Sequence, residues 1–199
     1  MVRARDDRRH AAPPGRPGGG PDLTVHIVPM RRRHLRTVLR IEAETHPRPW
    51  SLSLFMSEMA LRSSRAYYVA RVDGLVVGYV GLMMSGEEGH VTTVAVDPVW
   101  HRRKIGTRLL LVAAREAIQR GATALTLEVR MSNAGAQELY RQFGFRPAGV
   151  RRNYYVETNE DALIMWAEDV NEPAYAARLD VIDAGLRGTT IVTDDRRAL

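Results

Sequence analysis

The chain has 199 residues, 45% of them hydrophobic, which is long enough for one domain with a substantial core. The absence of cysteine excludes disulfide bonds, a thiol nucleophile and a cysteine zinc site, and no apolar run approaches the roughly 18 residues of a membrane span. A net charge of +6 favours anionic partners such as phosphate groups or nucleic acid, and without cysteines or a secretory signal the protein is expected in the cytoplasm.

Both ends of the chain are expected to lie outside the folded domain. Residues 1–22 form a basic, Pro- and Gly-rich tail with little to bury, so disorder is expected, and an inert extension is favoured over a weak contact with nucleic acid. Residues 23–170 form the domain, and residues 171–199 form a C-terminal extension. A short amphipathic helix in this extension is expected to pack on the domain or on a second copy, with its apolar positions at Tyr175, Leu179, Ile182 and Leu186.

Apolar periodicity and turn residues divide the domain into eleven elements. In chain order the sequence predicts a strand at 25–28, helices at 30–44 and 51–62, strands at 66–72, 75–84 and 91–96, a helix at 105–120, a strand at 124–129, a helix at 133–143, and strands at 145–150 and 161–167. This order predicts an α/β fold with one mixed sheet.

A few residues fix the ends of these elements. Ser51 is a good N-cap for the second helix, whose inner side is expected to carry Leu54, Phe55 and Met59. Asp73-Gly74 is the strongest short hairpin signal in the chain. Residues 86–89 are expected to form a turn, and the strand at 124–129 is so continuously apolar that burial on both faces is expected.

A basic loop at 101–107 leads from a strand directly into a helix. Backbone N–H groups at a helix start have no intrahelical partner, and the helix dipole lies behind them, so such a loop suits an anion. Arg102, Arg103 and Lys104 add positive charge, and Gly106 lets the backbone approach a phosphate closely. A solvated basic turn is an equally good interpretation of the loop alone.

The run V-A-V-D-P followed by H-R-R-K-I-G-T-R resembles the acetyl-CoA signature of the GNAT superfamily of N-acetyltransferases, whose pattern is Q/R-x-x-G-x-G/A. Here His101 replaces the first residue and Lys104 the first glycine, and only Gly106 is kept. The resemblance implies that backbone amides of 102–107, including those of Ile105 and Thr107, meet the pyrophosphate of acetyl-CoA.

The same resemblance assigns a role to the strand before the loop. It implies that Val94, Ala95 and Val96 lie beside the acetyl-pantetheine arm, that their backbone pairs with it as with an added strand, and that the sheet splays open there. For the valine side chains, simple core packing is the alternative.

A carboxylate and a tyrosine form the candidate proton-transfer pair. Glu128 interrupts a buried strand, where a carboxylate is costly unless it is paired, wetted or functional. An ion pair with a nearby arginine explains it as well as catalysis does. Tyr140 lies on the next predicted helix and shares a helical face with Asn133 and Ala136. Considered by itself, it is best interpreted as an aromatic residue of the core.

Together these residues carry a more specific resemblance. The motif L-E-V-R-x-S-N-x-x-A-x-x-L-Y-x-x-x-G-F at 127–145 is similar to that of the RimI-like ribosomal-protein alanine N-acetyltransferases, and the resemblance covers roughly residues 25–168. It implies a single, mixed, mostly antiparallel sheet flanked by about four helices. It also implies that Glu128 is the general base, through a water, that Tyr140 is the general acid, and that Asn133 contacts the cofactor. Direct transfer from acetyl-CoA in a ternary complex is implied, and it requires no metal.

The expected acceptor is a protein N-terminus, as in a ribosomal protein. An α-amine titrates near 7.7–8.0 and a lysine near 10.4, so freeing a lysine at pH 7 costs about 3.5 kcal/mol more. Tyr154 and Tyr155 could flank the incoming peptide, and Arg151 and Arg152 could meet acidic surfaces. Packed aromatics of a hairpin and solvated charges are equally good interpretations of these residues. A lysine side chain or a small-molecule amine is the alternative acceptor, and a non-catalytic protein bound to ribosomes or RNA is the second alternative. No membrane and no specific nucleic acid is expected, and the oligomeric state is open.

Overall fold

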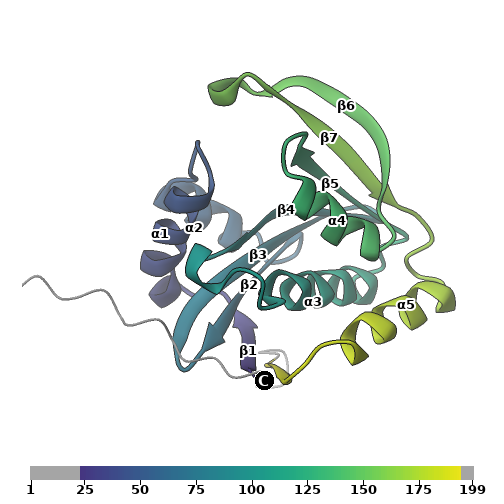
Figure 1. Cartoon of the computed structure of the whole chain (residues 1–199), viewed down its shortest axis with the longest axis horizontal. Coiled ribbons are helices and arrows are strands. Elements are labelled where there is room, and N and C mark those ends of the chain that lie inside the picture. The colour runs from purple at the N-terminus through teal and green to yellow at the C-terminus, as the bar shows by residue number, and fades with distance from the viewer. Residues whose placement is uncertain (1–22, 194–199) are drawn as a thin grey trace, which may run out of the picture.

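An eight-stranded sheet organises residues 23–193, which are the residues that the computed structural model describes (Figure 1). The strand order is β6-β7-β5-β4-β3-β2-β1-β8. The strands are β1 (Thr24–Pro29), β2 (Arg65–Val72), β3 (Leu75–Ser85), β4 (Glu88–Val96), β5 (Ala124–Arg130), β6 (Arg146–Tyr155), β7 (Glu160–Ala167) and β8 (Thr189–Val192). The predicted tail at 1–22 lies outside the described residues.

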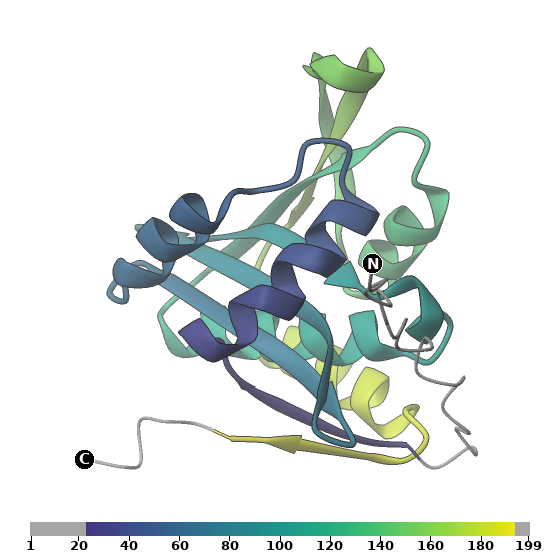
Figure 2. The ribbon, with the colours of Figure 1, turned by 90° about the vertical axis from the view of Figure 1, so that its left-hand side faces the viewer.

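Five α-helices flank the sheet within the described part of the chain, together with three short 3-10 turns. The α-helices are α1 (Leu35–Thr45), α2 (Leu52–Ala60), α3 (Ile105–Gln119), α4 (Ala134–Gln142) and α5 (Pro173–Ala184). Helices α1 and α2 cover one face of the sheet, and α3, α4 and α5 cover the other (Figures 1 and 2). Within residues 23–193 no helix is long and apolar enough to cross a membrane.

Most neighbouring strands run antiparallel, and only the pairs β4/β5 and β1/β8 run parallel. The prediction of one mixed, mostly antiparallel sheet is therefore confirmed. Each face has its own core: Leu109 and Leu110 of α3 belong to the larger cluster, while Val38 of α1 and Phe55 of α2 belong to the smaller one.

The residues predicted to begin, end or turn these elements do so in the structure. Ser51 Oγ accepts the Leu54 N–H at 3.2 Å and so caps α2. Asp73 and Gly74 both have positive φ, at 50° and 81°, as a two-residue hairpin turn between β2 and β3 requires. Gly144 ends α4 at a φ of 84°, which glycine adopts without steric cost.

Two local expectations were wrong. Strand β4 begins at Glu88 rather than at 91, because the turn contains only Gly86 and Glu87. Gly89 therefore lies within the strand, and a Cβ there would come within 2.7 Å of a Leu125 methyl group, so packing explains this glycine better than a turn does. Leu54 of α2 was expected inside but is 39% exposed, since only Phe55 of that helix is buried.

Strand β5 is not buried equally on its two faces. Its residues alternate between buried and half-buried, and Leu125, Leu127 and Val129 face the larger core beneath α3. Thr126 and Glu128 therefore point to the opposite face. The prediction that β5 is buried on both faces was wrong, because these two polar residues alternate with the apolar ones and mark a second, less buried face.

The C-terminal extension is built onto the same sheet. After α5, which buries Tyr175 and Leu179, strand β8 pairs in parallel with β1, an addition that the sequence did not predict. The guanidinium of Arg108 in α3 is buried and donates to the Thr190 hydroxyl and to the Arg187 carbonyl. The division at residue 170 stays a prediction, but α5 and β8 pack on the sheet and on α3.

Candidate active site

Strands β4 and β5 separate at the centre of the sheet. Their parallel pairing runs only from Glu88 opposite Ala124 to His90 opposite Thr126. Residues 91–96 of β4 then continue without a partner on this side, and so do residues 127–130 of β5 on the side that faces β4. The sequence resemblance predicted this splay.

A bulge accompanies the divergence. The register between β3 and β4 shifts so that Gly81 faces Thr93 and Leu82 faces Val91, which leaves Thr92 as the extra residue. Bulges bend the bulged strand and increase its twist. This local bend helps to carry the end of β4 away from β5.

The predicted cofactor strand has one edge free of sheet pairing. Val94, Ala95 and Val96 pair with β3 only, so their opposite edge faces the gap between β4 and β5. The valine side chains pack against the larger core, and Ala95 belongs to the smaller one. Thr93 Oγ1 is buried and has no hydrogen-bond partner. An added extended group would find backbone partners here.

The start of the basic loop is fixed by contacts with α1 and β4. Asp97 follows β4, accepts the Val99 N–H at 3.1 Å and pairs with Arg40 of α1 at 2.5 Å. His101 Nε2 lies 2.9 Å from the Val96 carbonyl oxygen. These contacts connect the loop to both α1 and β4.

Helix α3 begins with free N–H groups, as the sequence predicted. Its first intrahelical bond runs from Arg108 N to Lys104 O at 3.1 Å, so the preceding N–H groups, including those of Gly106 and Thr107, have no intrahelical acceptor. Ile105 and Thr107 bury their side chains, so only their backbone could meet a ligand. A Cβ at Gly106 would meet no atom closer than 3.6 Å, so the packing of this chain does not require glycine there.

The three basic residues of the loop differ in their surroundings. Arg102 and Lys104 are exposed, whereas the Arg103 guanidinium lies over the Trp100 ring, 4.9 Å from its centroid. Both exposed residues adopt positive φ, 62° at Arg102 and 58° at Lys104. Lys104 therefore has a left-handed conformation, which favours glycine, and glycine is the residue of the family pattern at this position.

This conformation gives a stability prediction. We expect Lys104→Gly to be more stable than Lys104→Ala by about 1 kcal/mol, because a left-handed conformation costs roughly 1–2 kcal/mol at a residue with a Cβ, and the greater freedom of glycine in the unfolded chain offsets part of that gain. Both variants remove the same charge, so their difference isolates the backbone. Urea unfolding measures it, and equal stabilities would contradict the left-handed backbone at 104.

Glu128 lies on β5 with both carboxylate oxygens engaged. His90 Nε2 lies 3.1 Å from Oε2, and Arg151 Nη2 lies 3.3 Å from Oε1. The hydrogen bond with His90 and then the nearby charges of His90 and Arg151 hold the pKa of Glu128 below its ordinary value, although burial opposes this. Only 11% of the side chain is exposed. Glu128 is therefore ionised at neutral pH, and the ion pair with an arginine coexists with the position expected for a catalytic group.

Tyr140 lies on α4 and is buried in the larger core, where its ring packs 5.9 Å from that of Phe145. Burial raises the pKa of Tyr140 well above its ordinary value, and the nearby Tyr155 adds to the shift. The phenol thus keeps its proton at neutral pH, as a proton donor must.

The two predicted catalytic residues belong to opposite faces of the sheet. Tyr140 belongs to the core beneath α3 and α4, whereas Glu128 alternates with residues of that core and so points to the other face. Tyr155 of β6 interacts electrostatically with both of them.

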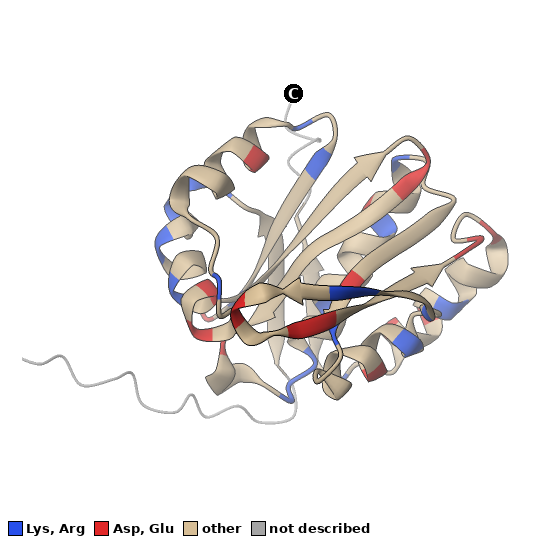
Figure 3. Cartoon of the chain, turned by 90° about the horizontal axis from the view of Figure 1, so that it is seen from above, with Lys and Arg blue, Asp and Glu red and all other residues tan. Residues whose placement is uncertain are grey.

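The β6–β7 hairpin extends beyond the rest of the sheet and carries the aromatic pair (Figure 1). The Tyr154 and Tyr155 rings pack edge to face at 5.1 Å, and Arg130 lies over Tyr155 at 3.7 Å. Arg151 pairs with Glu128 and lies near Tyr154, but 55% of its side chain is exposed, so its contact with an acidic surface stays a prediction. Figure 3 shows basic and acidic segments of this hairpin on neighbouring strands.

Asn133 caps α4, since its Oδ1 accepts the Ala136 N–H at 3.0 Å. Its contact with a cofactor stays a prediction.

Sequence reasoning missed His90, which follows a glycine in β4 and carries no motif. Only the parallel register with β5 brings it beside Glu128. Within residues 23–193 no three His, Asp or Glu side chains gather to hold a metal ion.

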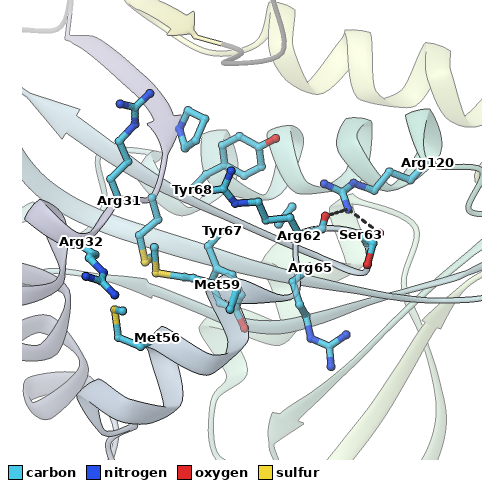
Figure 4. A pocket seen from close by; sticks show the side chains of 14 residues that line it. Arg31, Arg32, Met56, Met59, Arg62, Ser63, Arg65, Tyr67, Tyr68 and Arg120 are labelled. Atoms are coloured by element: carbon cyan, nitrogen blue, oxygen red, sulfur yellow. Dashed lines mark hydrogen bonds between the residues drawn. The ribbon is translucent and has the colours of Figure 1, made fainter. Parts of the chain in front are cut away.

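A cavity of about 1100 Å³ lies elsewhere, bordered by α2, the start of β2 and the end of α3 (Figure 4). Methionine and tyrosine side chains line its inner part, including Met56, Met59 and Tyr67, and five arginines also line it. No predicted site residue lines this cavity.

Comparison with known proteins adds three findings. A model of the acetyltransferase (GNAT) family matches residues 33–145. The ribosomal protein bS18-alanine N-acetyltransferase of Escherichia coli K12 is 36% identical over 141 residues, covering 70% of this chain and 94% of that protein. The N-alpha-acetyltransferase RimI of Mycobacterium tuberculosis is 40% identical over 133 residues, covering 63% of this chain and 79% of the relative.

A solved structure agrees with the sequence matches. The crystal structure of the ribosomal-protein-S18-alanine N-acetyltransferase from Escherichia coli superimposes with a TM-score of 0.67 at 33% identity, covering 73% of this chain and 94% of that one. The similarity therefore spans nearly the full length of a protein with this fold.

Proposed function

The chain belongs to the acetyltransferase (GNAT) family and is an N-acetyltransferase, and from this premise we propose that it transfers acetyl from acetyl-CoA to the N-terminal α-amine of a protein, as the ribosomal-protein alanine enzymes do. The observation that carries the proposal is the splay of β4 from β5, with the ionised Glu128 on the strand that borders the gap. A cytoplasmic location and a catalytic domain at 23–170 belong to the same proposal.

The described residues fit acetyl-CoA as co-substrate. The unpaired edge of Val94, Ala95 and Val96 suits the amides of an extended pantetheine arm, and the buried Thr93 hydroxyl lacks a partner. The start of α3, with the exposed cations of Arg102 and Lys104, suits the pyrophosphate. Acetyl-CoA supplies the activated acetyl group.

Glu128 is assigned the base step. An ammonium cannot attack a thioester, so the incoming amine must first lose a proton. The carboxylate is ionised at neutral pH and lies on the face of α1 and α2. It accepts the proton through a water, and no covalent enzyme intermediate is needed.

Tyr140 is assigned the acid step. The departing thiolate is helped by receiving a proton, and the phenol, protonated because burial raises its pKa, can donate one from the face of α4. Asn133 at the start of the same helix is assigned a contact with the cofactor.

The acceptor is best taken as an α-amine. It titrates near 7.7–8.0, so a single carboxylate acting through water releases it more easily than a lysine near 10.4. The relatives named above carry names that specify ribosomal protein bS18 alanine or an α-amine. Acetylation of a lysine or a small-molecule amine is the alternative, and it uses the same base and acid.

A panel of amines tests the proposal. We expect mass spectrometry to find acetyl-CoA-dependent acetylation of peptides that begin with alanine, and none on a peptide with a blocked N-terminus and a free lysine. Glu128→Gln is the matched control for non-enzymatic transfer. Acetylation of only the lysine peptide or of a polyamine would establish the alternative, and transfer to no amine would reject the proposal.

A further inference from the structure

The cavity of about 1100 Å³ beside α2 takes no part in the proposed reaction, and it lies where two neighbouring strands differ in length (Figure 4). Strand β1 ends at Pro29, opposite Tyr68, whereas β2 begins three residues earlier, at Arg65. The first residues of β2 therefore have no strand beyond them on the β1 side. Helix α2 borders this recess from one face of the sheet, and the end of α3, at Arg120, borders it from the other.

Apolar side chains form the floor of the cavity. Met30, Tyr67 and Tyr68 are buried there, and Met56 and Met59 of α2 are half-buried at its side. Methionine is unbranched and flexible, so a wall of methionines adapts to apolar side chains of different shapes. The floor therefore suits an apolar side chain of a ligand without fixing which one.

Two of the five arginines that line the cavity are held in place by the protein. Arg65 pairs with Glu58 at 2.7 Å, and Arg120 pairs with Glu116 at 2.6 Å. The Arg120 guanidinium also donates to two main-chain carbonyls of the loop after α2. Both guanidinium groups are oriented before a ligand binds, so they lose little conformational entropy on binding.

The other three arginines, Arg31, Arg32 and Arg62, are exposed. Among residues 23–193 no Asp or Glu lines the cavity. The five arginines, together with the paired carboxylates Glu58 and Glu116, carry a net charge of +3. The cavity therefore attracts an anion, and arginine binds carboxylate and phosphate groups through two parallel hydrogen bonds.

The combination of an apolar floor and a cationic rim distinguishes between classes of anionic ligand. Single-stranded nucleic acid binds through aromatic faces on which its bases stack, but Tyr67 and Tyr68 are both buried. A phosphate group would use the arginines and leave the methionines unused. Protein interfaces, in contrast, are enriched in methionine and arginine and place an apolar anchor inside a polar rim. A protein segment that carries both carboxylates and an apolar side chain uses every part of the cavity.

We propose that this cavity is a docking site for an acidic segment of a partner protein. An apolar side chain of the segment enters between Met30, Met56 and Met59, and its neighbouring carboxylates pair with the three exposed arginines. The inference goes beyond the proposed acetyl transfer and does not depend on it, because no residue assigned to the reaction lines the cavity.

Short fluorescent peptides with a central leucine or phenylalanine flanked by Asp and Glu provide the probe, and fluorescence anisotropy measures their binding to the full chain. We expect saturable binding of at least one of them. Replacing its central residue by serine should weaken binding by about 10- to 100-fold, the effect of burying one large apolar side chain. Added salt should also weaken binding, because it screens the exposed arginines.

Two double variants test the position of the charges. Arg32→Ala/Arg62→Ala removes two exposed guanidinium groups of the cavity and should weaken binding by about tenfold, since an exposed ion pair contributes up to about fivefold. Arg36→Ala/Arg146→Ala is the matched control, because both arginines are exposed and lie outside the cavity. It removes the same charge and should change the Kd by no more than about twofold. Circular dichroism confirms that each variant is folded.

Nuclear magnetic resonance of methyl-labelled methionines locates the bound peptide. The methyl signals of Met56 and Met59 should shift when the peptide is added, and Met56→Leu and Met59→Leu assign them. The signal of Met131, an exposed residue after β5, should not move. A shift of Met131 alone would place the peptide elsewhere and overturn the inference.

The inference would also be overturned if neither peptide bound, if the serine peptide bound equally well, or if the two double variants bound alike. Tighter binding of an oligouridine than of either peptide would assign the cavity to RNA instead. A dimer that the peptide dissociates would assign it to a second copy of the chain. Since no result depends on acetyl transfer, a failure of the proposed function leaves this test unaffected.

Discussion

Glu128→Gln is expected to lower kcat at pH 7 by about 10²- to 10⁴-fold, because the amide has nearly the same shape as the carboxylate but cannot accept a proton. The fold should persist, since the side chain keeps its size and the amide oxygen can still accept from one of the two present donors, Arg151 at 3.3 Å or His90 at 3.1 Å. Thiol release from acetyl-CoA, followed with a thiol reagent, measures the rate. An unchanged rate near pH 7 would remove Glu128 from the base role.

Glu138→Gln provides the matched control, because Glu138 is an α4 side chain that is 65% exposed and paired only with Arg141 at 3.6 Å. The dependence of protein stability on pH provides a second test of Glu128. The pKa of Glu128 is lower in the folded protein than its ordinary value of 4.5, so the ionised carboxylate stabilises the fold at neutral pH. This stabilisation is lost as the pH falls below about 4.5 and through the folded pKa. The difference in unfolding free energy between wild type and Glu128→Gln should therefore shrink in acid.

Tyr140→Phe is expected to lower kcat by about 10- to 100-fold with little change in stability, because the ring keeps its packing on Phe145 and only the proton donor is lost. Since burial raises the pKa of Tyr140, ionisation of this phenol should not lower the wild-type rate within the range where an ordinary tyrosine ionises, near pH 10. Rate measurements from pH 6 to 10 check both statements.

Tyr175→Phe is the control for this experiment. Tyr175 is also a buried tyrosine of the larger core whose pKa is raised by burial, but it lies on α5, and its hydroxyl has no hydrogen-bond partner. Removing that hydroxyl should leave kcat unchanged. If Tyr140→Phe behaves like Tyr175→Phe, Tyr140 is a core residue and another group protonates the thiolate.

Local signals in the sequence predicted most of the fold. Helix α3 was expected at 105–120 and occupies Ile105–Gln119, because a glycine stop and an apolar face mark it unambiguously. Glu128 and Tyr140 could be proposed as site residues because a charge inside an apolar strand and a family motif are both visible in one short stretch.

Non-local pairing could not be predicted in the same way. Strand β8 has only four residues, and nothing within them specifies that β1 is their partner. His90 became part of the site only through the register of β4 with β5. The strand at 124–129 was expected to be buried on both faces because its apolar residues outweighed Thr126 and Glu128, the two that mark its other face.

The buried guanidinium of Arg108 has a thermodynamic consequence, because it joins the first turn of α3 to the C-terminal extension. Arg108 lies one turn after Lys104, the N-cap of α3 in the basic loop at 101–107, and it donates to Thr190 and to the Arg187 carbonyl in the C-terminal extension. Coupling between sites is reciprocal. If the extension restrains the first turn of α3, a ligand that binds this turn will hold the extension more firmly by the same free energy, and slower amide hydrogen exchange in β8 would report it.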